Sequence, residues 1–90
     1  MNFALIGQRI HDMHSQTMWN DDVQFGANSS GAWVRINRKD PGARPIVGLV
    51  SWEDLAKEGG NPIGDAIFRA FDRANVSTHE RMNFMRRVSA

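Results

Sequence analysis

Histidines, serines and carboxylates are the residues of this chain whose chemistry could support catalysis or metal binding. His11 and His14 stand three residues apart in a predicted helix, so both rings could reach one metal ion. Asp12 points away from them, and no metal site is predicted there. The chain has no cysteine and no Gly-x-Ser-x-Gly turn, so neither a thiol nor a serine with a matching base is indicated as a nucleophile.

Turns and helix starts explain the remaining candidates for catalysis. The carboxylate pairs 21–22 and 53–54 are each adjacent in sequence, whereas the pair that hydrolyses a glycoside faces across a cleft. Residues 59–64 have the glycines of a phosphate-binding loop, but Asp65 and Ala66 follow where that loop needs a lysine and a hydroxyl. We therefore expect a protein that is not an enzyme and that uses no cofactor.

Basic side chains are concentrated in two segments, although the formal net charge is only +1. The first segment, residues 35–44, contains a single acidic residue, Asp40. A tryptophan precedes it, and Trp and Arg are the residue types that most often dominate the binding energy of protein interfaces. The sequence predicts a site for a protein partner with an acidic surface, made of Trp33, Arg35, Arg38, Lys39 and Arg44.

The second basic segment lies near the end of the chain and supports an alternative function. Residues 62–74 and 78–88 are predicted helices joined by a short turn, a spacing that is compatible with a helix-turn-helix. The alternative is nucleic-acid binding through the hairpin 35–44 or the helix 78–88. The candidate residues on that helix are His79, Arg81, Asn83, Arg86 and Arg87.

A predicted helix over residues 2–18 must position the first histidines. Steps of three and four between apolar residues predict one buried stripe, while Arg9, Asp12 and Gln16 fall on the opposite face. The members of the stripe are Phe3, Ile6, Ile10, Met13 and Thr17. Trp19 and residues 20–22 mark the end of this helix.

The middle of the chain has the pattern of strands and turns. Residues 26–31 are predicted to be a loop, and residues 32–37 alternate between two faces. One face carries Ala32, Val34 and Ile36, and the other carries Trp33, Arg35 and Asn37. Residues 46–50 are apolar throughout, which predicts a central strand covered on both sides. We expect an antiparallel three-stranded meander in which residues 46–50 pair with residues 32–38.

The last third of the chain is predicted to be helical. Ser51 caps a short helix that runs through Glu58, and the two glycines that follow end it. Asn61 with Pro62 starts a second helix, and Ser77 starts a third. The fold class is therefore α+β: an N-terminal helix, a three-stranded antiparallel sheet and a helical C-terminal third, in a single small domain of residues 1–90.

The expected function is that of a small, non-enzymatic binding protein that occupies a surface of a partner protein. Inhibitors and adaptors of the kind that phages and mobile elements encode fit this description. Leu5, Trp33 and Phe68 are apolar residues on otherwise polar faces, so a homodimer is compatible with the sequence as well. Because the chain lacks cysteine and has no apolar run long enough to cross a bilayer, we expect a cytoplasmic protein without a membrane partner.

Overall fold

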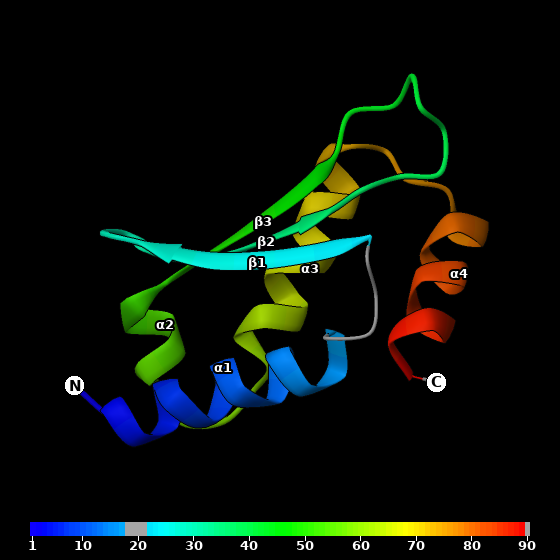
Figure 1. Cartoon of the computed structure of the whole chain (residues 1–90). Coiled ribbons are helices and arrows are strands. Elements are labelled where there is room, and N and C mark those ends of the chain that lie inside the picture. Colours follow the sequence, from blue (N-terminus) through cyan, green and yellow to red (C-terminus); the bar gives the residue numbers. More distant parts are fainter. Residues whose placement is uncertain (18–21, 90) are drawn as a thin grey trace.

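The computed structural model describes the backbone of residues 1–17 and 22–89, and the side chains of residues 1–15 and 22–84. The predicted α+β architecture is confirmed (Figure 1). In chain order the elements are α1 (Phe3–Thr17), β1 (Val23–Asn28), β2 (Gly31–Ile36), β3 (Ile46–Ser51), α2 (Trp52–Ala56), α3 (Pro62–Arg73) and α4 (Thr78–Ser89). The predicted end of the first helix, at Trp19 and the residues after it, lies largely outside the described residues.

The sheet is the predicted antiparallel meander, with the strand order β1-β2-β3. Ile36 of β2 lies between Val23 of β1 and Ile46 of β3. The prediction of a central strand over residues 46–50 is wrong, because β3 is an edge strand. A continuous apolar run is typical of a buried strand, but it also occurs where the outer side chains of an edge strand stay uncovered.

The predicted loop over residues 26–31 is also too long, because most of it is strand. β1 continues to Asn28, and Gly26 pairs with Trp33. The turn consists of two serines, and the Asn28 carboxamide oxygen accepts hydrogen bonds from the N–H groups of Ser30 (2.9 Å) and Gly31 (3.2 Å). A side-chain acceptor of this kind closes a tight turn without further residues.

The core lies between the helices and one face of the sheet. One cluster of buried residues contains Met13, Val23, Val34, Ile36, Ile46, Ala70, Phe71, Val76 and Phe84. A second contains Ile6, Ala32, Val50, Leu55 and Ala66, and Ile63 packs against both. At Gly48 the helix α3 approaches the backbone of β3 directly, since a Cβ there would lie 3.2 Å from the carbonyl oxygen of Ala66.

All three predicted helix starts in the last third of the chain are confirmed by their caps. In each, a side-chain oxygen accepts a hydrogen bond from an N–H of the first turn, which would otherwise have no partner. Ser51 accepts from Asp54 (3.1 Å), Asn61 from Gly64 (3.0 Å) and Ser77 from Glu80 (3.2 Å). α2 ends at Ala56, earlier than the predicted Glu58.

The first helix departs from its predicted faces at two residues. Ile6 and Met13 of the stripe are buried, but Phe3, the first residue of α1, is 76% exposed. Arg9, predicted on the polar face, donates to the carbonyls of residues 54, 55, 57 and 59 at 2.6–3.2 Å. Carbonyls at the end of a helix lack partners, so a guanidinium that reaches them joins α1 to α2.

Candidate binding surface

The second face of the sheet is not covered by any helix of the described chain (Figure 1). The register places three rows of residues on it, each running across all three strands, and the row next to α2 consists of Asn28, Gly31 and Ser51. We call the other two rows the outer sheet face: Gln24, Arg35 and Val47 form one, and Gly26, Trp33 and Leu49 form the other. Leu49 is 63% exposed and Val47 is 42% exposed, so the face presents aliphatic side chains to solvent.

The ring of Trp33 lies over Gly26 of β1. A Cβ at Gly26 would fall 2.5 Å from the Cζ2 atom of the indole, so only glycine leaves room for the ring at this position. The ring is half-buried against the strand and half-open to solvent. The sequence predicted that the face of Trp33 is not an ordinary core face, and the strand alternation places Arg35 beside it.

Arg35 is the cation of the outer sheet face. It is exposed on the central strand, opposite Gln24 on one side and Val47 on the other. Within the described side chains, no carboxylate forms a salt bridge with it. The apolar surface therefore carries one positive charge that is not neutralised internally.

Arg38, a second predicted partner-binding residue, is engaged within the protein. Its Nε and Nη2 atoms donate to the two carboxylate oxygens of Glu80, each at 2.8 Å. This hydrogen bonding to Glu80 raises the pKa of Arg38 above the ordinary arginine value. The paired geometry is the one that guanidinium groups favour, and it fixes the chain after β2 to α4. A partner could use Arg38 only by competing with Glu80.

Lys39 and Arg44 lie in the loop between β2 and β3, and both are exposed. Asp40 shapes the tip of this loop, since its Oδ1 atom accepts from the N–H of Gly42 (2.9 Å) and its carbonyl accepts from that of Ala43 (3.0 Å). The five predicted residues thus divide into a pair on the sheet, a pair in the loop, and Arg38 at α4.

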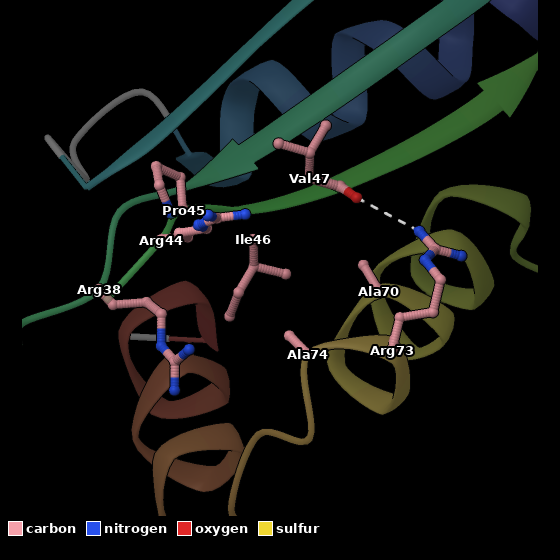
Figure 2. Close-up of a pocket in the computed structure, with 8 residues that line it drawn as sticks. All are labelled: Arg38, Arg44, Pro45, Ile46, Val47, Ala70, Arg73 and Ala74. Atoms are coloured by element: carbon pink, nitrogen blue, oxygen red, sulfur yellow. Dashed lines mark hydrogen bonds between the residues drawn. The ribbon is translucent and has the colours of Figure 1, made fainter. Parts of the chain in front are cut away.

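Arg44 lines a hollow of about 450 Å³ between the start of β3 and the end of α3 (Figure 2). Its lining residues are Arg38, Arg44, Pro45, Ile46, Val47, Ala70, Arg73 and Ala74. Arg73 was missed by the sequence predictions, and its Nη2 atom donates to the carbonyl of Val47 at 3.4 Å. Nothing in the local sequence links it to the hairpin, because only the packing of α3 on β3 joins them.

The described polar residues of α4 mostly hold that helix in place. Arg81 donates to the carbonyl of Val76 (3.0 Å) and to Asp72 (2.9 Å), and it lies over the ring of Phe71 at 5.6 Å. The His79 ring and the Asn83 amide are within hydrogen-bonding distance at 3.3 Å. The side chains of Arg86 and Arg87 lie outside the described residues.

A second hollow, of about 550 Å³, opens beside α1 and α3. It explains two of the apolar residues on polar faces, because Leu5 and Phe68 both line it. The remaining lining residues are Gln8, Arg9, Asp12, Met13, Val23, Val34, Gly60, Asn61, Ile63, Gly64, Ile67 and Phe84.

His11 and His14 do not belong to a cluster of possible metal ligands among the described residues. The ring of His14 packs edge-on against Phe25 with a centroid distance of 5.6 Å. Among the described residues, no three His, Asp or Glu side chains come together as metal ligands would. Every helix in the described ranges is too short or too polar to cross a lipid bilayer. Comparison with protein-family models, with curated proteins and with solved structures gave no match to this chain.

Proposed function

We propose that the chain is a non-enzymatic protein that binds a partner protein through its outer sheet face. The observation that supports this most directly is the exposure of Leu49 and Val47 on a sheet whose other face carries the whole helical layer. An antiparallel sheet with one solvated face normally presents polar side chains there. Beside the polar Gln24 and Arg35, this face exposes two aliphatic residues and part of a tryptophan.

Covering this face would stabilise a complex by removing apolar surface from water. The gain is about 25 cal/mol for each Å² of apolar surface, and about 1.5–3 kcal/mol for a leucine that becomes fully buried. Trp33 adds a broad ring that is already packed on Gly26. Little side-chain entropy is lost when a partner covers a ring that is fixed beforehand.

The charges on and near this face favour a partner with acidic groups. Arg35 has no carboxylate partner among the described residues, and the exposed Lys39 and Arg44 extend the positive charge into the adjoining loop. An inhibitor or adaptor of this design acts by covering the surface that its partner needs elsewhere. Two copies placed face to face would instead bring their Arg35 side chains together, which opposes self-association in that arrangement.

Nucleic-acid binding is favoured less by the arrangement of the same residues. Arg38 and Arg81 are paired with Glu80 and Asp72, so they are not free to neutralise phosphates. The aliphatic surface of the outer sheet face has no role against a phosphate backbone.

The test is capture of a binding partner with a matched pair of charge reversals. We expect wild type and Lys57→Glu to capture the same protein, and the dissociation constant of the purified pair to rise at least tenfold for Arg35→Glu (~1.4 kcal/mol). Lys57 is an exposed cation of the α2 region, away from the outer sheet face, so it controls for net charge. Equal binding by Arg35→Glu would contradict the proposal. So would a shift of mixed-sequence duplex DNA that weakens with salt and is lost in Arg35→Glu.

A further inference from the structure

β3 has a free edge that points away from β2. The carbonyl of Val47 accepts from Arg73 of α3, so it does not face the neighbouring strand (Figure 2). In an antiparallel strand, backbone groups two residues apart point to the same side. The N–H and C=O groups of Leu49 therefore also lie at this edge.

The residues of β3 do not protect this edge against pairing with another strand. Proteins commonly place lysine, proline or a bulge in an edge strand to prevent association. The strand Ile46–Ser51 contains no charged residue and no proline, and it pairs with β2 in unbroken register. At the start of the strand, Pro45 and the long 3.4 Å hydrogen bond from Arg73 to the carbonyl of Val47 give this edge limited protection.

The two ends of β3 carry opposite charges. At its start, Arg44 and Arg73 border the 450 Å³ hollow, and neither has a carboxylate partner among the described residues. At its other end, Glu53 is exposed in the first turn of α2 and takes part in no salt bridge with a described residue. Both α2 and α3 lie on the helical side of the sheet (Figure 1).

We propose that two copies of this chain pair edge to edge through β3, antiparallel, with Leu49 on the two-fold axis. Antiparallel pairing brings the start of one β3 beside the end of the other. With Leu49 opposite Leu49, Val47 pairs with Ser51 of the second copy, so the start of β3 in one copy lies beside the first turn of α2 in the other. Each Glu53 carboxylate then faces the hollow between Arg44 and Arg73, and this occurs twice because the interface is symmetric.

The pairing also gives strand partners to the backbone groups at this edge. The Val47 carbonyl accepts from an N–H of the second strand, which releases Arg73 to bind Glu53. The two Leu49 side chains become cross-strand neighbours on the outer sheet face, where such pairs stabilise a sheet. Among the described residues, the two ends of β1, the other edge of the sheet, do not carry such a complementary pair of charges. Pairing at the edge leaves the outer sheet face uncovered, with Arg35 on the central strand of each copy. The dimer and the proposed function are therefore independent of each other.

The experiment is a charge exchange read by sedimentation equilibrium over a dilution series. We expect wild type to dimerise, and Glu53→Arg and Arg73→Glu each to raise the dimer dissociation constant at least tenfold. The double variant with both reversals should recover most of the wild-type affinity, because the complementary pair is restored in the opposite sense. Glu58→Arg and Lys57→Glu, which reverse exposed charges that the proposed pairing does not use, should dimerise as wild type does.

Amide hydrogen exchange provides the second measurement, since it reports the backbone of β3 directly. Exchange at the Leu49 N–H should slow as protein concentration rises, in wild type and in the double variant but not in Arg73→Glu. A wild type that is monomeric throughout the series would overturn the inference. A dimer that neither single reversal weakens, or one without protection at Leu49, would overturn it as well, and both results would leave the Arg35 test of the proposed function unaffected.

Discussion

The two faces of β3 carry similar aliphatic side chains, but only one face is buried. Val50 is 5% exposed and Leu49, the next residue along the same strand, is 63% exposed. On the helical side, aliphatic side chains form the core against Phe71 and its neighbours. On the outer side, the aliphatic side chains of Val47 and Leu49 remain exposed to water. The contribution of a β-strand residue to stability is therefore decided by the layer it faces, more than by its type.

The arginines divide in the same way. Arg9 and Arg38 hold elements of the fold together, the first through carbonyls at the end of α2 and the second through Glu80. Arg35 and Arg44 have no such role among the described residues, and both stand beside exposed apolar surface. Arginines that look alike in the sequence thus stabilise the fold in one case and stay exposed, as proposed binding groups, in the other.

The largest expected effect tests the contrast between the two faces on one strand. Ile46→Ala should lower the free energy of unfolding by about 2–5 kcal/mol, because it removes a buried side chain from the core. Leu49→Ala should change it by no more than about 0.5 kcal/mol, since the side chain is mostly in water. Urea denaturation in the Arg73→Glu background measures both with the β3 edge unpaired. Equal losses would show that the outer sheet face is buried in solution.

A smaller effect is expected where α3 touches the backbone of the sheet. In Gly48→Val, the added Cβ would stand 3.2 Å from the Ala66 oxygen, and the two methyl groups would force α3 away from β3. We expect a loss of about 1–3 kcal/mol in the free energy of unfolding. Gly7→Ala is the control, because nothing lies within 4 Å of its added Cβ, and it should not destabilise the protein. Unchanged stability in Gly48→Val would contradict the close packing of α3 on β3.

The smallest effect on stability is expected on the outer sheet face itself. Gly26→Ala places a methyl group where the Trp33 ring lies, and we expect the ring to move into solvent while stability changes by less than about 1 kcal/mol. Acrylamide quenching of tryptophan fluorescence should increase. The same substitution in a Trp33→Phe background should leave quenching unchanged, which assigns the signal to this ring. No increase in quenching would mean that the ring does not lie over Gly26.

Local signals in the sequence determined much of this fold. Ser51, Asn61 and Ser77 could be identified as helix caps because each bonds an N–H only three residues away. The alternation through residues 32–37 assigned Trp33 and Arg35 to one face, since successive side chains of a strand point to opposite sides. The α+β class and the meander followed from such short-range rules.

Only the tertiary structure decided which of these faces and charges stay in solvent. The apolar run of β3 predicts a strand, but which of its side chains are covered depends on how the helices pack on the sheet. Arg38 donates to Glu80, Arg9 donates to carbonyls at the end of α2, and Arg73 donates to the carbonyl of Val47. Each of these hydrogen bonds joins residues that are far apart in the sequence. Such contacts cannot be predicted from the spacing of residues in the sequence, because they form only when separate elements pack together. Leu49 and Arg35 became candidates for binding once these contacts had placed the other apolar and basic side chains in the fold.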